Sequence, residues 1–372
     1  MHSLLGPILL KRRYYYDPAK PPGTCGRAPL DTALGLLGQC TPGLAKIATR
    51  ATAQSSFEES SADLAALAGI KLGARRLQRL SQEVGSTLRE TLKRLPPPRL
   101  DPAANTPAAI PVLYILGDGT GIPMNKASLS GVKGRGPEGM ARTREVKIGG
   151  VCTQTSTDEQ GRPVRDENST TWIAGFEQSV DFGLRLREEA LRRGAPRAQR
   201  TVFLADGAAW LWEVARTNFP EALQILDFWH ASEYLAAMAR LLEVPNSAAF
   251  TERYGRWRAD LAASRLDSIL SDARAAAALH LPVDSTATGE MSKLLNYLEN
   301  HRTRMNYAAY RAEGLYIGSG VVEAGCKTVV GQRFKRSGMF WSEPGARNLL
   351  HIRTALLSQS RFEDFWAARA NA

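Results

Sequence analysis

Val112-Leu113-Tyr114-Ile115-Leu116 is a short, continuous apolar run rich in β-forming residues, and Gly117-Asp118-Gly119-Thr120-Gly121 follows it directly. This pattern predicts a buried strand that ends in a glycine-rich turn. A second apolar run, Thr201-Val202-Phe203-Leu204-Ala205, is followed in the same way by Asp206-Gly207-Ala208. We therefore expect each of the two aspartates directly after a buried strand and before a glycine.

Strand-like and helix-like segments alternate around these two runs. Three further segments have the composition of strands and two have helical periodicity, namely 145–152, 170–174 and 223–226 for the strands and 176–193 and 209–217 for the helices. This alternation predicts an α/β core. In the first of the two helices, Val180, Leu184 and Leu191 are expected on one face, and Gly194 is expected to end the helix.

The composition changes along the chain predict several structural regions. A proline-rich stretch resists packing and predicts a linker between an N-terminal region and the α/β core. The expected regions are 1–95, mostly helical; 96–111, the linker; 112–228, the first part of the core; 229–315, almost wholly helical; and 316–372, basic and helical.

Two short helices are predicted within the N-terminal region. Ser60-Ser61-Ala62-Asp63 is expected to cap the first, Gly69 to make a turn, and Gly73 to Val84 to form the second. The second carries interleaved basic residues at Arg75, Arg76 and Arg79. This pattern fits a helix-turn-helix that binds DNA, and it fits an ordinary helical hairpin equally well.

Length and composition bound the class of protein. The chain has 372 residues with 44% hydrophobic and 23% charged residues, which is ordinary for a globular protein and excludes collagen or disorder throughout. It contains no run of about 18 apolar residues that could span a membrane. The basic cluster Lys11-Arg12-Arg13 follows the first apolar run, whereas a secretory signal has the reverse order. We therefore expect a cytoplasmic, nucleoid-associated protein.

Basic residues concentrate at the two ends of the chain. The net charge is +11, with 15 Lys and Arg against 7 Asp and Glu in residues 1–100 and 8 against 3 in residues 324–372. The span between them holds 25 basic and 27 acidic residues. Basic ends around an acid-rich centre are typical of a protein that binds nucleic acid phosphates. A basic surface that only contacts solvent would give the same charge distribution.

The cysteines give no sign of a structural metal. Cys25, Cys40, Cys152 and Cys326 are scattered and form no CxxC pair. Structural zinc needs closely spaced soft ligands, so a zinc site is not expected. Disulfides are not expected in a reducing compartment. The simplest interpretation is that these thiols are buried or incidental.

The two aspartates predict a metal site. Residues that follow strands of an open α/β sheet converge at one edge, where ligands bind. Two carboxylates about 4 Å apart repel by on the order of 4 kcal/mol at an effective dielectric near 20. A divalent cation between Asp118 and Asp206 would remove this cost, and oxygen ligands favour Mg²⁺, with Mn²⁺ also acceptable. The alternative is that each aspartate only caps a following helix.

Glu323 is the best candidate for a third acidic ligand. It lies in Ile317-Gly318-Ser319-Gly320-Val321-Val322-Glu323-Ala324-Gly325-Cys326-Lys327, where Gly-Ser-Gly opens an expected helix. Lys327 is four residues further on and would share a helix face with the carboxylate, an arrangement that suits phosphate binding. The alternative is an ordinary ion pair between Glu323 and Lys327.

At this point the chain resembles the ISKra family of insertion-sequence transposases, over about residues 110–370. The resemblance rests on five blocks that occur in the same order. They are Gly117-Asp118-Gly119-Thr120, Phe203-Leu204-Ala205-Asp206-Gly207-Ala208, Asp227-Phe228-Trp229-His230-Ala231-Ser232-Glu233-Tyr234-Leu235, Gly318-Ser319-Gly320-Val321-Val322-Glu323-Ala324-Gly325-Cys326-Lys327 and Arg333-Phe334-Lys335-Arg336-Ser337-Gly338-Met339-Phe340-Trp341-Ser342.

The resemblance implies a ribonuclease-H-like catalytic core with Asp118, Asp206 and Glu323 as its metal-binding triad. It also implies that 229–315 is a helical insertion domain and that Asp227-x-x-His230 lies near the scissile DNA. The implied activity is that of a DDE transposase, which cleaves transposon ends and joins them to target DNA with Mg²⁺. The implied partners are double-stranded DNA and further copies of the chain.

The same resemblance assigns DNA contacts. Lys327, Arg333, Lys335 and Arg336 would hold phosphates. His230 would position DNA or the attacking water, or else be a histidine packed between helices. Trp341 would stack on an unpaired base, or else belong to the core.

The N-terminal region departs from the family pattern. Pro29-Leu30-Asp31 is present, but only Cys25 precedes it, where the family carries paired cysteines. This predicts a degenerate zinc element and a shortened N-terminal region. Two other functions therefore stay open, a decayed element copy that binds DNA without catalysis and a structure-selective nuclease on the same fold.

Overall fold

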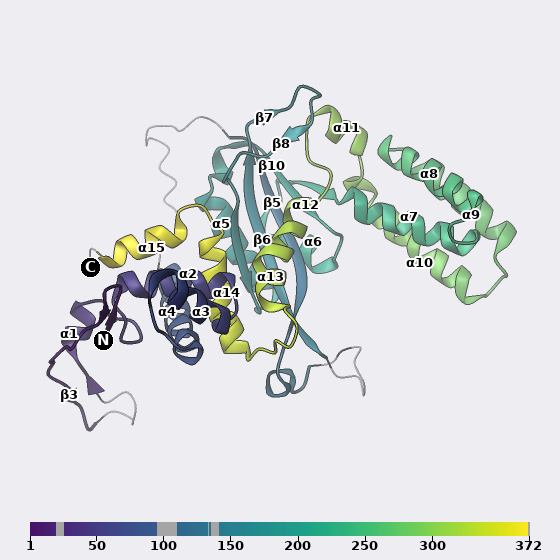
Figure 1. The fold of residues 1–372 in the computed structure, drawn as a ribbon. Helices are drawn as coiled ribbons and strands as arrows, with labels where there is room; N and C mark the ends of the chain where they lie inside the picture. Colours follow the sequence, from purple (N-terminus) through teal and green to yellow (C-terminus); the bar gives the residue numbers. More distant parts are fainter. Residues whose placement is uncertain (20–25, 95–109, 133, 135–140, 371–372) are drawn as a thin grey trace.

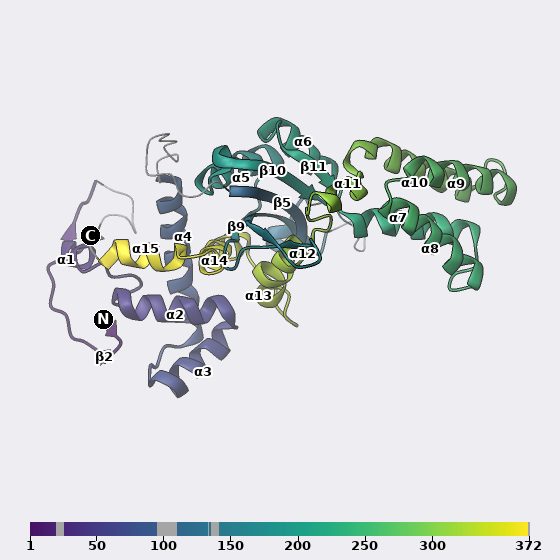
Figure 2. The same ribbon diagram turned by 90° about the horizontal axis from the view of Figure 1, so that it is seen from above.

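The computed structural model describes residues 1–19, 26–94, 110–132, 134 and 141–370. Three groups of elements lie in a row (Figure 1). N-terminal and C-terminal helices form one end, a twisted sheet the middle, and a group of helices from the second half of the chain the other end (Figure 2). Of the expected linker 96–111, residues 96–109 lie outside the described residues, and Ile110 and Pro111 already belong to the sheet.

The central sheet confirms the expected α/β class. Its five strands are β5 (Ile110–Pro123), β6 (Thr143–Gln154), β9 (Thr171–Gly175), β10 (Ala198–Ala205) and β11 (Leu223–Leu226). They lie in the order β11-β10-β5-β6-β9. β5, β6 and β9 form an antiparallel meander, whereas β10 and β11 run parallel to β5.

The glycine-rich segment after Leu116 is not the turn that we expected. β5 continues through it to Pro123, because residues up to Pro123 pair with β6 as far as Thr143. The glycines serve close packing instead, since a Cβ at Gly117 would lie 2.4 Å from Leu211. The expectation of a half-buried strand at 145–152 is also wrong, because β6 is buried from Val146 to Gln154.

Helices cover both faces of the sheet, which explains that burial. One face carries α5 (Ser179–Arg192) and α6 (Ala209–Asn218). The other carries α12 (Gly320–Gly325), the π-helical turn η5 (Cys326–Gly331), α13 (Gln332–Phe334) and α14 (Glu343–Leu356) (Figure 2). Successive side chains of β5 point alternately to these two faces.

The expected buried face of α5 is wrong. Val180 and Leu184 are 69% and 51% exposed, whereas Phe182 and Leu186 are fully buried. Both sets have helical spacing, so periodicity alone could not decide between them. The glycines of β6 decide it, because Gly149 leaves room for Leu186 and Phe182, which a Cβ there would approach to 2.7 and 3.1 Å.

The N-terminal region is mostly helical, as expected. Its main helices are α2 (Pro42–Gln54), α3 (Phe57–Ala68) and α4 (Ala74–Arg94). Gly69 ends α3 in the left-handed conformation. The cap expected at Ser60–Asp63 is wrong, because Ser56 caps α3 and forms a capping box with Glu59. α2 and α4 pack against α14, so their apolar residues continue the core of the sheet.

The region 229–315 is helical, as expected. It contains α7 (Phe228–Leu242), α8 (Ala248–Ala262), α9 (Leu266–His280), α10 (Thr286–Asn300), η4 (Arg302–Arg304) and α11 (Tyr307–Ala312). Trp257 of α8 is fully buried among these helices and donates a hydrogen bond from Nε1 to Asp272 Oδ2 at 2.7 Å. The buried residues of this segment belong to the same hydrophobic cluster as those of the sheet, and its helices lie beside the sheet (Figure 1).

Short elements complete the described chain. They are β1 (His2–Ser3), β2 (Gly6–Pro7), β3 (Tyr15–Tyr16), β4 (Gly26–Arg27), α1 (Pro29–Ala33), η1 (Lys126–Leu129), β7 (Ser156–Thr157), β8 (Pro163–Val164), η3 (Ala195–Arg197) and α15 (Arg361–Ala370). Among the described residues, no helix combines the length and the apolar character that crossing a membrane requires.

Two helical glycines provide a matched test of the packing between α4 and α14. A Cβ at Gly85 would lie 2.2 Å from the Asn348 carbonyl oxygen, whereas a Cβ at Gly255 of α8 meets nothing within 4 Å. Gly85→Ala should lower the free energy of unfolding by roughly 1–3 kcal/mol because it forces the helices apart. Gly255→Ala should raise it by up to about 1 kcal/mol through helix propensity. Denaturant unfolding of both variants checks the opposite signs, and equal effects would contradict the packing argument.

Candidate functional site

The sheet brings three aspartates into one row. Ala205 of β10 pairs with Gly117 of β5, and Leu226 of β11 pairs with Ala205. The residues that follow these three are Asp118, within β5, and Asp206 and Asp227, directly after β10 and β11, so their backbones lie in a row where β10 and β11 end. The expected convergence of Asp118 and Asp206 at one edge therefore follows from the strand register.

Asp118 lies on the face of the sheet that carries α12. Gly117 faces α6, so the next side chain points to the opposite side. Asp118 Oδ1 accepts a hydrogen bond from Gly119 N at 2.6 Å, and Oδ2 accepts one from Cys326 Sγ at 3.0 Å. No helix follows Asp118, because β5 continues, so helix capping does not explain this aspartate.

The charges of the two other acids act on Asp118. Burial is the largest cause that raises the pKa of Asp118, and the negative charges of Asp206 and Glu323 raise this pKa further. Burial also raises the pKa of the Cys326 thiol, helped by the Asp118 charge. The thiol therefore keeps its proton and stays a hydrogen-bond donor to the carboxylate.

Asp206 occupies a tight turn between β10 and α6. Its Oδ1 accepts a hydrogen bond from Ala208 N at 3.1 Å, and its carbonyl oxygen accepts one from Tyr297 Oη at 3.2 Å. Gly207 has φ +98°, and a Cβ there would lie 1.9 Å from Tyr297 Oη. Only glycine tolerates both the backbone conformation and this approach.

Asp227 holds the helix that carries Glu323. Its side chain is buried, with Oδ1 accepting from His230 N at 2.6 Å and Oδ2 accepting from Ser319 N. Ser319 is the N-cap of α12, and Glu323 lies one turn into that helix with an exposed side chain. Because Asp227 directly follows β11, the pairing of β11 with β10 also sets the position of α12 and of its residue Glu323.

The donor set fits a divalent cation, although its side chains are not gathered around one point. Among the described residues, no three His, Cys, Asp or Glu side chains form a ready set of metal ligands. One oxygen of Asp118 is directed instead at Cys326. Carboxylate oxygens are nevertheless the donors that Mg²⁺ and Mn²⁺ prefer.

His230 lies at the start of α7 within a group of aromatic rings. Its Nδ1 is 3.6 Å from Glu233 Oε2, and its ring meets the Tyr234 ring edge-on at 5.4 Å. Tyr234 and Tyr297 stack with ring centroids 3.7 Å apart. The sequence did not reveal Tyr297, because nothing in a helical segment 91 residues after Asp206 indicates a contact with it.

The expected phosphate contacts separate into exposed and buried residues. Lys327, Lys335 and Arg336 are exposed. Lys335 Nζ donates to Thr120 Oγ1 at 2.6 Å, two residues beyond Asp118 on the same face of β5. Arg336 forms an ion pair with Glu59 of α3. Within the described chain, Glu323 accepts a hydrogen bond from Ser319 Oγ at 3.5 Å and does not form the alternative ion pair with Lys327.

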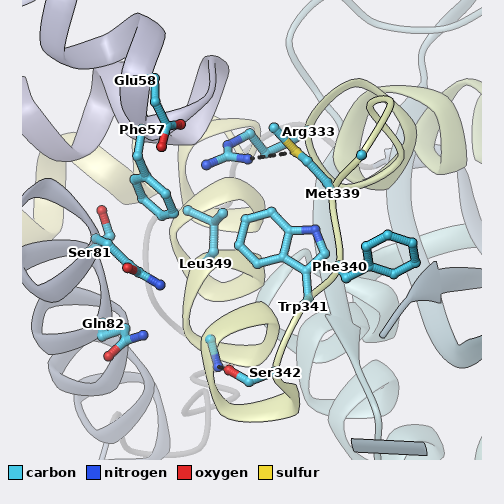
Figure 3. Close-up of a pocket in the computed structure, with 13 residues that line it drawn as sticks. Phe57, Glu58, Ser81, Gln82, Arg333, Met339, Phe340, Trp341, Ser342 and Leu349 are labelled. Atoms are coloured by element: carbon cyan, nitrogen blue, oxygen red, sulfur yellow. Dashed lines mark hydrogen bonds between the residues drawn. The ribbon is translucent and has the colours of Figure 1, made fainter. Parts of the chain in front are cut away.

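Two of the expected DNA contacts need correction. Arg333 is 0% exposed and Trp341 is 9% exposed. The Arg333 guanidinium lies against the Phe57 and Trp341 rings at 4.9 and 5.0 Å, and Trp341 Nε1 donates to the Phe334 carbonyl oxygen at 3.2 Å. Both side chains are buried against Phe57 of α3 (Figure 3), so Arg333 holds no phosphate here and Trp341 is a core residue.

Comparison with protein-family models and with curated proteins found no match to this chain.

The raised pKa of Asp118 predicts a pH-dependent stability effect. An asparagine side chain carries no charge, so Asp118→Asn should raise the melting temperature without divalent cations, by roughly 2–4 °C for each kcal/mol of repulsion and desolvation removed. Because the folded pKa lies above the unfolded value, this gain should grow as the pH rises from the unfolded pKa through the folded one, and vanish below both. Thermal unfolding at several pH values measures it. A gain that is largest in acid would contradict the argument.

Proposed function

We propose that this chain is a DDE transposase that resembles the ISKra family, with Asp118, Asp206 and Glu323 as its catalytic acids. The observation that carries the proposal is that the negative charges of Asp206 and Glu323, both far away in the sequence, each raise the pKa of Asp118 at one edge of the sheet. Lys335, which contacts Thr120 two residues beyond Asp118, and the exposed cations Lys327 and Arg336 support a polyanionic substrate.

The sheet topology supports a ribonuclease-H-like core. An antiparallel meander is extended by two parallel strands, each reached through a helix on the same face. The helical segment between β11 and α12 then enters between the second and third acids, where the resemblance expects an insertion domain. Its helices contact the core through Tyr297 and the Asp206 backbone.

Asp118, Asp206 and Glu323 would hold the divalent cations. When bound, these ions would activate the attacking hydroxyl and stabilise the leaving oxygen in an in-line displacement at phosphorus. The Gly119 amide and the Cys326 thiol orient the Asp118 carboxylate. Asp227 fixes the start of α12 and thereby the approach of Glu323.

The surrounding cations would hold the DNA backbone. Lys335 contacts Thr120 on the strand that carries Asp118, so its ammonium group can neutralise a phosphate beside the reacting one. Arg336 already has a carboxylate partner in Glu59, so binding a phosphate would exchange one anion for another. Such contacts make binding weaken with salt. The proposed substrates are transposon ends and target DNA at the nucleoid, with further copies of the chain as partners.

Removing any of the three acids tests the proposal. Asp118→Ala, Asp206→Ala and Glu323→Ala should each abolish Mg²⁺-dependent cleavage and strand transfer while leaving duplex binding intact, because DNA is held by the cations. Glu290→Ala, an exposed carboxylate of α10 remote in sequence from the triad, serves as the control. Gel assays of cleavage and joining with matched binding measurements check the result.

Each alternative function has its own outcome in the same assays. Cleavage without joining by the wild-type chain would identify a nuclease, and DNA binding without any Mg²⁺-dependent cleavage would identify a non-catalytic DNA-binding protein. Full activity in any of the three variants would remove that residue from the site.

Asp227→Asn tests the positioning of α12. The amide can keep one oxygen as an acceptor for His230 N but presents an NH₂ group to Ser319 N, so the link to α12 is lost. Loss of such a supporting contact is expected to reduce cleavage by about 10–100-fold. Cleavage rates and thermal unfolding are compared, and a fall in melting temperature without a change in rate would contradict a positioning role.

A further inference from the structure

The insertion, residues 229–315, contacts the sheet through two tyrosine hydroxyls. Tyr297 of α10 donates from Oη to the carbonyl oxygen of Asp206 at 3.2 Å. Tyr307 of α11 donates from Oη to the carbonyl oxygen of Leu226 at 3.0 Å. These two carbonyl groups lie at the ends of β10 and β11. The insertion therefore bonds to the backbone of both parallel strands at the edge where the acids stand.

The turn that carries Asp206 is shaped around the Tyr297 hydroxyl. Gly207 has φ +98°, and a larger residue there would collide, because a Cβ would lie 1.9 Å from Tyr297 Oη. The helix that follows, α6, has no side-chain cap, and the turn uses the Asp206 carboxylate instead, whose Oδ1 accepts from Ala208 N at 3.1 Å. The bond from Tyr297 therefore fixes the peptide group of a residue whose carboxylate is shared between this turn and the candidate metal site.

Arg304 and His301 hold the same end of the insertion against α6 and β11. The Arg304 guanidinium lies over the Trp212 ring of α6 at 4.3 Å, and its Nε donates to Gln224 Oε1 of β11 at 2.8 Å. The His301 ring centroid is 5.6 Å from that of the same indole. These contacts do not involve either tyrosine, so the removal of one tyrosine hydroxyl would leave the insertion docked on the sheet.

The Tyr297 ring is fixed by two aromatic neighbours. It stacks on the Tyr234 ring of α7 with centroids 3.7 Å apart and planes 7° apart, and it meets the His301 ring edge-on at 4.5 Å. A tyrosine side chain has only two torsions, so packing against both neighbours leaves its hydroxyl few other positions. The ring therefore forms a rigid link between α7, α10 and the end of β10.

We propose that Tyr297 is a positioning residue that couples the insertion to the metal site, an inference that rests on the proposed function. Its hydroxyl fixes the peptide group of Asp206 and thereby limits where that carboxylate can meet a divalent cation. Supporting hydrogen bonds of this kind are worth about 10–100-fold in metal affinity or activity. Because coupling between two sites is reciprocal, a cation held by the acids also stabilises the docked insertion.

Two tyrosine-to-phenylalanine changes give a matched test, because each removes one hydroxyl that donates to a backbone carbonyl oxygen and keeps the ring. Tyr297→Phe removes the bond to Asp206, whereas Tyr310→Phe removes a bond of 3.3 Å to the Thr303 carbonyl oxygen within the insertion. Mn²⁺ titration followed by electron paramagnetic resonance measures cation binding without DNA or catalysis. Tyr297→Phe should bind Mn²⁺ at least about tenfold more weakly than the wild type, and Tyr310→Phe should keep the wild-type affinity.

Hydrogen exchange provides the reciprocal measurement. Saturating Mn²⁺ should slow amide exchange in α10 of the wild type and of Tyr310→Phe, and this protection should be smaller in Tyr297→Phe. Equal Mn²⁺ affinities of the two variants, whether unchanged or reduced, or exchange in α10 that does not respond to Mn²⁺ in the wild type, would overturn the inference but leave the transposase proposal standing. A wild-type chain that binds no Mn²⁺ would refute both.

Discussion

The parallel pairing of β10 with β5 is the constraint on which the candidate site depends. A shift of one residue in this register would move Asp206 away from Asp118 and turn one of the two side chains to the other face. The register is fixed by burial, because every residue of β10 from Val202 to Ala205 is inside the core. Hydrophobic packing along two strands thereby holds together two carboxylates that repel each other.

Asp227 extends this constraint to the third acid. It follows β11 in the same row, caps α7 and accepts a hydrogen bond from the start of α12. One buried carboxylate thus joins the sheet, the helical insertion and the helix of Glu323. Tyr297 makes a second connection from the insertion to the turn of Asp206. The insertion is therefore held at two points beside the acids.

Two buried arginines connect the N-terminal helix α2 to the C-terminal segment that follows Glu323. Arg353 of α14 donates from Nε to the Val329 carbonyl oxygen of η5 at 2.7 Å and also donates to the Ala53 carbonyl oxygen of α2. Arg333 bonds to the neighbouring Thr52 carbonyl. Cations that meet the carbonyl groups at the end of α2 satisfy polar groups that a helix leaves unpaired. The N-terminal region consequently packs onto the segment that follows Glu323.

The sequence by itself determined the α/β class, the helical segment 229–315 and the two aspartates that follow buried apolar runs, because apolar runs, periodicity and glycine positions are local signals. It did not determine that β5 continues past Asp118, which face of α5 is buried, or that Arg333 and Trp341 are inside, since each depends on what packs against them. The roles of Cys326, Asp227 and Tyr297 were hidden for the same reason. Their partners lie 208, 92 and 91 residues away, and only the tertiary structure decides which distant groups share a hydrogen bond.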